Sequence, residues 1–244
     1  MSALAAIHDQ AAAERAEHLA DLLEVTSPAT RARQAQAAVL PVLEPLAGLL
    51  PHGGLAKGTV TEVTDPGLLL ALAAGPATAD PHAWTAAIGM PTLGLAAAAG
   101  YGLDLQRLVV ADHPGDHYPE VLTALATACP VIIAAAPDHL PPRTTERLAA
   151  HLRRTGTVLI TPGPWPGGAR LRLEVTARAW SGLGDGWGQL TGRRVTVEVS
   201  GRGAAARPRS AQLWLPDASG RLSAVAEAVG AGAVPGSAAA AASA

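Results

Sequence analysis

The stretch LLPHGGLAKGTVTEVTDPGLLLALAA, residues 49–74, decides the fold of this 244-residue chain. A tight Gly53-Gly54 turn leads into an alternating strand at 59–63, and the apolar run that follows predicts a short buried helix at 67–74. A strand, a glycine-marked turn and a helix in this order are typical of the entry to a nucleotide-binding α/β core. The stretch therefore predicts the frame of a nucleotide site.

The turn itself lacks the chemistry of a phosphate-binding loop. Such a loop has glycine N–H groups that surround the phosphates, a Lys as counter-charge and a Ser or Thr hydroxyl for magnesium. Here the turn is Thr64-Asp65-Pro66-Gly67, and Asp65 places a carboxylate where an anion would lie. We therefore expect a degenerate, inactive nucleotide site at these four residues.

Composition limits the classes of function open to the chain. A net charge of −2 excludes a uniformly basic nucleic-acid binder, so any basic surface is local. The single cysteine, Cys129, excludes an intramolecular disulfide and fits a reducing cytoplasm. The N-terminus lacks a signal-peptide pattern, and the longest weakly polar run, 86–101, is too short for a membrane span. We expect a cytoplasmic protein without membrane contact.

Strand-like and helix-like segments alternate from residue 59 onward. Strands are predicted at 59–63, 83–89, 107–111, 131–135 and 157–161. Helices are predicted at 67–74, 92–100, 116–128 and 143–154. Strand-like runs without crossover helices follow at 171–177, 194–200 and 211–215, separated by glycine-rich loops at 162–169 and 181–192. The predicted fold class is α/β: a mostly parallel twisted sheet with helices on both faces and an antiparallel C-terminal strand extension.

The chain divides into three predicted segments. Residues 1–50 form an N-terminal arm, with a helix at 3–25 and a Pro-containing linker. Residues 51–222 form the α/β core, and residues 223–244 a C-terminal segment that is largely a disordered Ala/Gly/Ser tail. The arm is compatible with packing on its own core and with docking on a neighbouring copy, so the oligomeric state stays open.

The core resembles the RecA family of recombination ATPases. The resemblance rests on the pattern L-P-x-G-G-L-x-x-G-x-V-x-E-V at 50–63 and on a strand, basic turn and strand at 194–215. It covers roughly residues 40–222 and implies a RecA-like fold.

The chain is more closely similar to ImuA-type accessory proteins of mutagenic DNA repair, a RecA-like subfamily. The additional motifs are MPTLGL (90–95), WPG (165–167), WSGLG (180–184), GRGAAARPR (201–209) and LWLP (213–216). This resemblance implies an ImuB-type, Y-family polymerase-like partner and, through it, an error-prone replicative-type polymerase. It also implies a role in translesion synthesis during the SOS response to DNA damage.

An active ATPase of this family needs three contributors, and the sequence lacks each of them. The phosphate loop is lost between Thr64 and Leu68, and no carboxylate follows the second strand, which ends in GMPT (89–92). Ala136 stands where an Asp would end the apolar strand and hold magnesium. Phosphoryl transfer depends on this positioning and charge stabilisation. We therefore expect no ATP hydrolysis, no catalytic residue and no cofactor.

Other catalytic or metal-binding patterns have little support. His113 and His117 are four residues apart, but Pro114-Gly115 between them breaks a helix, which favours a loop with Asp116 as a helix cap. No Cys/His spacing predicts zinc, and no nucleophile elbow predicts a Ser–His–Asp site. We expect no metal.

Arginines gather in the C-terminal strand segment, at 193, 194, 202, 207 and 209, with only Glu198 opposing them. Three interpretations remain open for Arg193, Arg194, Arg202, Arg207 and Arg209. They contact single-stranded DNA phosphates, or bind an acidic protein partner, or keep a solvated hairpin edge from aggregating.

Three tryptophans lie in or beside the glycine-rich loops. Trp165 is a candidate for stacking on a base, but the prolines around it favour packing or a protein contact. Trp180 and Trp187 flank the second loop and join the candidate partner- or DNA-binding set. The sequence thus predicts a non-catalytic adaptor, with a single-stranded DNA-binding module as the alternative and a P-loop ATPase disfavoured.

Overall fold

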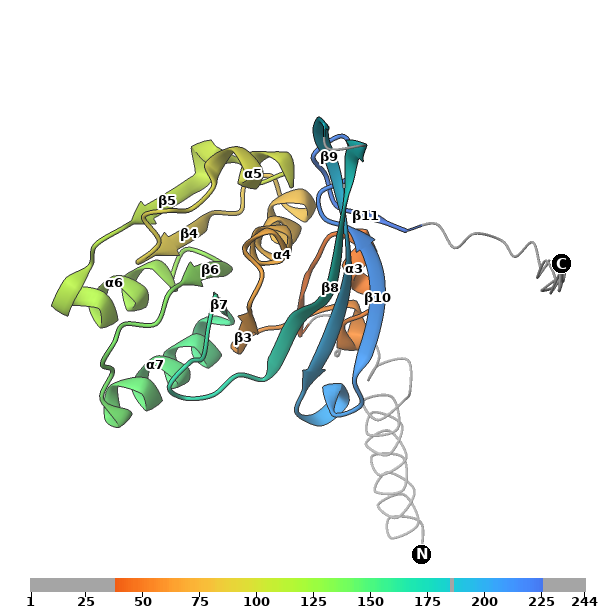
Figure 1. Ribbon diagram of the computed structural model, residues 1–244. Helices are drawn as coiled ribbons and strands as arrows, with labels where there is room; N and C mark the ends of the chain where they lie inside the picture. The colour runs from red at the N-terminus through yellow and green to blue at the C-terminus, as the bar shows by residue number, and fades with distance from the viewer. Residues whose placement is uncertain (1–37, 185–186, 226–244) are drawn as a thin grey trace, which may run out of the picture.

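The computed structural model describes residues 38–184 and 187–225 (Figure 1). Most of this chain is built on one nine-stranded sheet, with the strand order β11-β10-β9-β8-β3-β7-β6-β4-β5. Its strands are β3 (Val60–Val63), β4 (Thr85–Ile88), β5 (Leu108–Ala111), β6 (Val131–Ala134), β7 (Val158–Thr161), β8 (Leu171–Gly184), β9 (Trp187–Gly201), β10 (Arg209–Trp214) and β11 (Ser223–Ala224). A second sheet pairs β1 (Val39–Pro41) with β2 (Gly54–Ala56).

The predicted fold class is confirmed by the strand directions. Strand β3 is parallel to both of its neighbours, β7 and β8, and β4 is parallel to β5 and β6. From β8 onward the sheet is antiparallel, through β9 and β10 to the short edge strand β11. The α/β part therefore continues into an antiparallel C-terminal extension.

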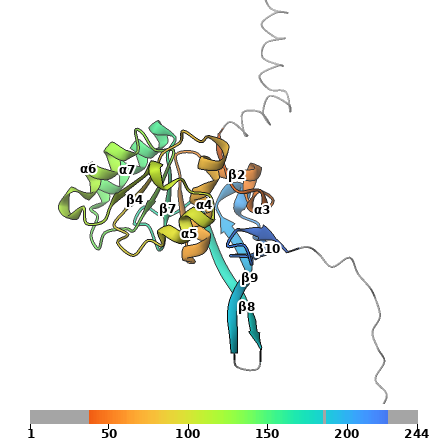
Figure 2. The ribbon, with the colours of Figure 1, turned by 90° about the horizontal axis from the view of Figure 1, so that it is seen from above.

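Helices cover both faces of the parallel part (Figure 2). Helices α4 (Pro66–Ala79) and α5 (Leu95–Gly100) lie on one face, and α6 (Tyr118–Leu125) and α7 (Pro142–Thr155) on the other. Because side chains alternate along a strand, β6 sends Val131 and Ile133 into the core under α4, while Ile132 and Ala134 enter the core under α6 and α7. This explains the continuous apolar run that the sequence shows there.

Helix α4 is longer than its sequence predicts. It starts with Pro66 in its first turn and runs to Ala79, with Pro76 inside it, instead of ending at Ala74. Its residues from 68 to 76 are all buried, and this burial outweighs the local cost of Gly75 and Pro76 in a helix. Gly75 has a packing role, because an added Cβ would lie 2.5 Å from the carbonyl oxygen of Pro41.

The predicted loop at 181–192 is wrong. These residues continue β8 and β9 as a long antiparallel hairpin that projects from the body (Figure 2). Its register shifts between Val175 and Ala177 and again between Ser181 and Leu183, where Gly182 has a φ of 102°. Gly182 therefore accommodates an irregularity within the ladder instead of belonging to a loop.

The segments before and after the core lie only partly within the described residues. The predicted arm helix at 3–25 and the tail from 226 lie outside the described residues. The described end of the predicted arm packs on the core, where α3 (Glu44–Ala47) buries Leu46 and β1 contacts α4. In the described ranges, no helix has the length and apolarity that crossing a membrane requires.

Helix α6 begins later than expected. It starts at Tyr118 after a 3-10 turn, η3 (Gly115–His117), and no side chain caps it, so Asp116 is not its cap.

Candidate functional site

The turn between β3 and α4 is closed by an ion pair. Asp65 is the N-cap of α4, and its Oδ1 accepts a hydrogen bond of 3.0 Å from the backbone N–H of Leu68. The same carboxylate receives two hydrogen bonds from Arg193 of β9, at 2.8 Å from Nη1 and 2.9 Å from Nη2. The two side chains are only 7% and 12% exposed. Asp65 therefore acts as both a helix cap and a buried counter-ion.

Arg193 is held on several sides. Its Nε donates to the carbonyl oxygen of Leu215 at 2.6 Å, and its guanidinium lies 5.6 Å from the ring centroid of Trp180. An added Cβ on Gly67 would lie 3.1 Å both from Nη2 of Arg193 and from the hydroxyl of Tyr101. The Arg193 and Tyr101 side chains thus lie close over the backbone of Gly67 in the turn.

The electrostatics of this pair keep Asp65 ionised. Burial alone raises the pKa of the Asp65 carboxyl, but the hydrogen bonds from Arg193 and from the Leu68 N–H outweigh it, so the pKa lies below its ordinary value. Burial raises the pKa of the neighbouring Tyr101 hydroxyl. Since Asp65 neutralises Arg193, the turn presents no net positive charge to an anion.

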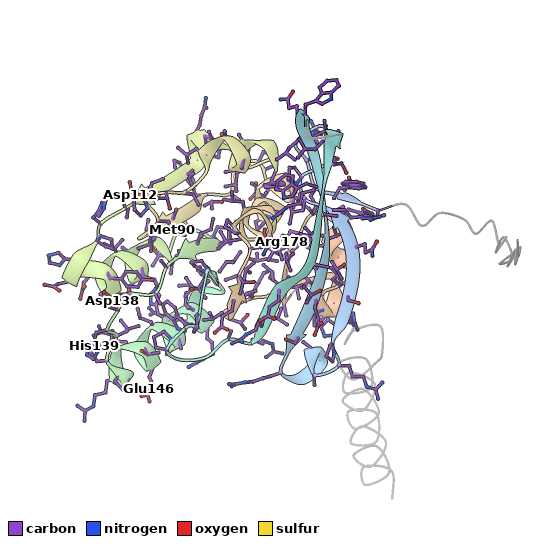
Figure 3. The ribbon with its side chains drawn as sticks, in the orientation of Figure 1. Met90, Asp112, Asp138, His139, Glu146 and Arg178 are labelled. Carbon is purple, nitrogen blue, oxygen red and sulfur yellow. The ribbon has the colours of Figure 1, made fainter. Side chains whose placement is uncertain are left out.

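The other positions that an ATPase would use carry apolar or distant side chains. Met90, after β4, is half-buried and packs against the core, and Ala135 and Ala136 follow β6. Asp138, farther along the same loop, is exposed. Figure 3 labels Met90 and Asp138. No three His, Cys, Asp or Glu side chains of the described residues come together as a metal site would require.

Glu62 is a buried charge that the sequence analysis did not single out as functional. It lies on β3, accepts a hydrogen bond from the Trp165 N–H at 3.1 Å and forms a 2.6 Å ion pair with Arg172 of β8. Glu62 therefore fixes the 162–170 loop to the sheet. The signal that could have found it is its place as the glutamate of the L-P-x-G-G-L-x-x-G-x-V-x-E-V pattern, in an otherwise apolar strand.

The structure divides the predicted partner- or DNA-binding set. Arg193 is internal, and Trp165 is 4% exposed within the core under α6 and α7. Arg194 is exposed on β9 and pairs in register with Ala179 of β8. The remaining arginines lie toward the other end of β9: Arg202 follows that strand, and Arg207 and Arg209 are exposed before and at the start of β10.

Two comparisons place the chain among known proteins. The family model described as the MT3502 N-terminal domain matches residues 48–167. The uncharacterized protein Rv3395c of Mycobacterium tuberculosis (strain ATCC 25618 / H37Rv) is 32% identical over 166 residues, which are 64% of this chain and 79% of that protein. The chain belongs to the MT3502 family. The MT3502 domain match includes Asp65 and ends before Arg193, so the ion pair joins the matched domain to the hairpin beyond it.

Beyond the MT3502 domain match, the hairpin carries exposed apolar side chains. Trp180 is 52% exposed, Leu183 62%, Trp187 80% and Leu190 47%. We call these four residues the hairpin patch. Large exposed apolar groups on a projecting element are typical of contact surfaces, where tryptophan is also enriched.

A groove of about 550 Å³ lies beside the patch in this MT3502-family chain. Its lining includes Ser181 and Thr191 of the hairpin, Trp214 of β10 and Asp217 in the following turn. Ser181 follows Trp180 directly along β8, so the groove and the patch meet on the same strand.

Proposed function

We propose that this chain is a non-catalytic RecA-fold accessory protein that acts through protein contact in SOS-induced mutagenic DNA repair. The proposed partner is an ImuB-type, Y-family polymerase-like protein, and through it an error-prone replicative-type polymerase in translesion synthesis. The ImuA-type motifs of the sequence suggest this partner. Membership of the MT3502 family does not by itself carry the repair role.

The observation that carries the proposal is the Asp65–Arg193 ion pair. A working phosphate site would present unpaired positive charge and open backbone N–H groups. Here the arginine is neutralised by a carboxylate that also accepts the Leu68 N–H of the helix N-terminus. This arrangement supports a role without ATP binding or hydrolysis, in which contact with other proteins is the activity.

The hairpin patch is the proposed contact surface. Buried tryptophans supply a large share of binding energy in protein interfaces, and truncating such a residue commonly costs at least about 2 kcal/mol. Arg178 and Arg194 are exposed on the same hairpin. Across 176–194 the sequence sets three arginines against a single acidic residue, Asp185, and Arg193 is already paired to Asp65. The partner surface that fits is therefore apolar with an acidic rim.

Co-purification and size-exclusion chromatography with the ImuB-type protein test this proposal. The wild-type chain is expected to elute with the partner, and a Trp180→Ala/Trp187→Ala variant to elute separately while retaining its thermal unfolding midpoint to within a few degrees. Trp84→Ala is the matched control. Trp84 is also exposed, at 40%, but it precedes β4, which lies next to the edge strand β5 and far from the hairpin in the strand order. The proposal fails if the wild-type chain and the partner elute separately while the purified chain hydrolyses ATP.

A further inference from the structure

A second, basic groove lies at the opposite end of β3 from the Asp65 turn. It has a volume of about 290 Å³ and is lined by the start of β3, the end of α7, the loop before β8 and the turn after β9. Its charged lining residues are Arg153, Arg170 and Arg202. These arginines come from three separate segments of the chain, so the fold, and not a local run of basic sequence, assembles the groove.

The charge of this groove is uncompensated within the described residues. No Asp or Glu lines it, and none of its three guanidinium groups forms an ion pair with a described carboxylate. The contrast with Arg193 is direct, since that arginine is internal and fully paired. Three like charges that share a groove repel one another, and a bound anion would relieve that repulsion.

The backbone around the groove is fixed in place. The Arg170 N–H donates to the Val60 carbonyl oxygen at 2.9 Å, and the Arg202 N–H donates to the Arg170 carbonyl oxygen at 3.0 Å. The Gly168 N–H donates to the Trp165 carbonyl oxygen at 2.7 Å, and the Trp165 N–H is itself held by Glu62. The arginine stems therefore start from ordered positions, which lowers the entropy lost when their heads bind a ligand.

Glycines line the groove where bulky side chains would narrow it. An added Cβ on Gly168 would lie 3.3 Å from Nη2 of Arg202, so this guanidinium lies over the glycine backbone. Gly58, with a φ of 71°, lets the end of α7 approach, because an added Cβ would lie 2.7 Å from the Arg153 Cα. An anion that enters here would meet guanidinium groups beside glycine backbone, which leaves room for it.

We propose that this groove binds the phosphate groups of a nucleic-acid strand. Guanidinium groups form bidentate hydrogen bonds with phosphate oxygens. Arg207, before β10, and Arg209, at its start, are also exposed and add positive charge to the segment that follows Arg202, which suits a repeating polyanion.

This activity is independent of the adaptor role and uses different residues from the hairpin patch. No aromatic side chain lines the groove among the described residues, so the contact is with the backbone and does not depend on base sequence. Binding is consequently steeply dependent on salt, because each neutralised phosphate releases counterions.

Fluorescence anisotropy with a labelled oligothymidylate tests the proposal on the full chain. Wild type is expected to bind the oligonucleotide at low salt, and added pyrophosphate is expected to displace it. The Arg153→Gln/Arg170→Gln/Arg202→Gln variant should bind at least about tenfold more weakly, with a logarithmic salt slope smaller by about 2 for this single strand. The triple Lys variant keeps the charge but loses bidentate geometry, so it should bind with intermediate affinity. A duplex probe compared with the single strand identifies which form presents the phosphates better.

Arg143→Gln is the matched control. Arg143 is exposed at the first turn of α7, whereas Arg153 is in its last, so the same charge is removed from the same helix far from the groove. Its affinity should stay within about twofold of wild type, and thermal unfolding should show that every variant is folded. If the triple variant does not fold, Arg202→Glu alone serves, since Arg202 is exposed and its expected loss is about tenfold. Two results would overturn the proposal. One is unchanged binding by a folded variant that lacks the groove arginines, and the other is no binding by wild type to the single-stranded or the duplex probe at low salt.

Discussion

Asp65 and Arg193 form a buried ion pair across 128 residues of sequence, with N–O distances of 2.8 and 2.9 Å. One partner caps the helix that would carry a phosphate loop, and the other lies on the hairpin that projects from the body. The pair therefore connects the turn between β3 and α4 to the proposed contact surface. Trp180 of the hairpin patch lies against the same guanidinium, so the turn, the arginine and the patch form one continuous structure.

Replacing Arg193 with Met should destabilise the fold. The substitution leaves the Asp65 carboxylate buried without its counter-ion, which costs about 3 kcal/mol of the free energy of unfolding. Urea unfolding followed by circular dichroism measures this loss. The Asp65→Asn/Arg193→Met double variant should recover part of it, because no charge is then buried alone. If the double variant lost the sum of both single effects, the two residues would be energetically independent and the prediction wrong.

Asp65 has two structural roles, and two substitutions separate them. Asparagine is a good helix N-cap, so Asp65→Asn keeps the cap on the Leu68 N–H and removes only the ion pair. Asp65→Ala removes both and should cost about 1 kcal/mol more. Equal unfolding free energies for the two variants would show that the cap contributes nothing.

The same pair predicts how stability depends on pH. The folded-state pKa of Asp65 lies below its unfolded-state value of about 3.9. The contribution of Asp65 to the free energy of unfolding is therefore complete above the unfolded-state pKa. It is lost as the pH falls through the folded-state pKa. Between about pH 5 and pH 2, the free energy of unfolding of wild type should fall more steeply than that of Asp65→Asn. Asp217, whose pKa is lowered to about 2 chiefly by its hydrogen bond with Ser219, is present in both proteins and cancels in the comparison. Parallel pH profiles would contradict this prediction.

The sequence predicts the parallel core well because local patterns decide it. The run Val131–Ala134 is apolar on both faces, and Gly156, with a φ of 76°, ends α7 as expected. The sequence does not predict the full length of the hairpin, because the glycines of 181–192 locally favour a loop whereas pairing between β8 and β9 decides the structure. Helix α4 passes its expected end for a similar reason, since tertiary burial outweighs local propensity.

The candidate site was harder to predict than the fold. The sequence shows that Asp65 is incompatible with a bound phosphate, but only the register of β8 and β9 reveals that Arg193 is its partner. Clustered arginines in the sequence also suggested a single basic surface. A long strand separates them in space, so Arg193 becomes internal while Arg202 joins Arg153 and Arg170 at the opposite end.

Mg-ATP should leave the thermal unfolding midpoint of the Arg153→Gln/Arg170→Gln/Arg202→Gln variant unchanged. This variant is used because the intact basic groove would itself bind polyphosphates. A ligand present at a hundred times its Kd stabilises the folded state by about 2.7 kcal/mol, which moves the midpoint of a chain of this size by several degrees. Because Asp65 and Arg193 satisfy each other over the turn, we expect no shift with ATP, ADP or a non-hydrolysable analogue. A concentration-dependent rise of the midpoint, abolished by a substitution at Gly67, would show that nucleotide binds at the turn and would contradict the closed arrangement.

Gly75→Ala tests the packing of α4 on the N-terminal strand. In an open helix this change stabilises by up to about 1 kcal/mol, because alanine restricts the unfolded chain and favours the helix. Here the added Cβ would meet Pro41 at 2.5 Å and Val42 more closely still, so the backbones must move apart. We expect a net loss of about 1–3 kcal/mol in urea unfolding. Gly48→Ala is the control, since Gly48 has a φ of −65° and no atom within 4 Å of an added Cβ. It should be neutral or slightly stabilising, and a stabilising Gly75→Ala would show that β1 does not pack there.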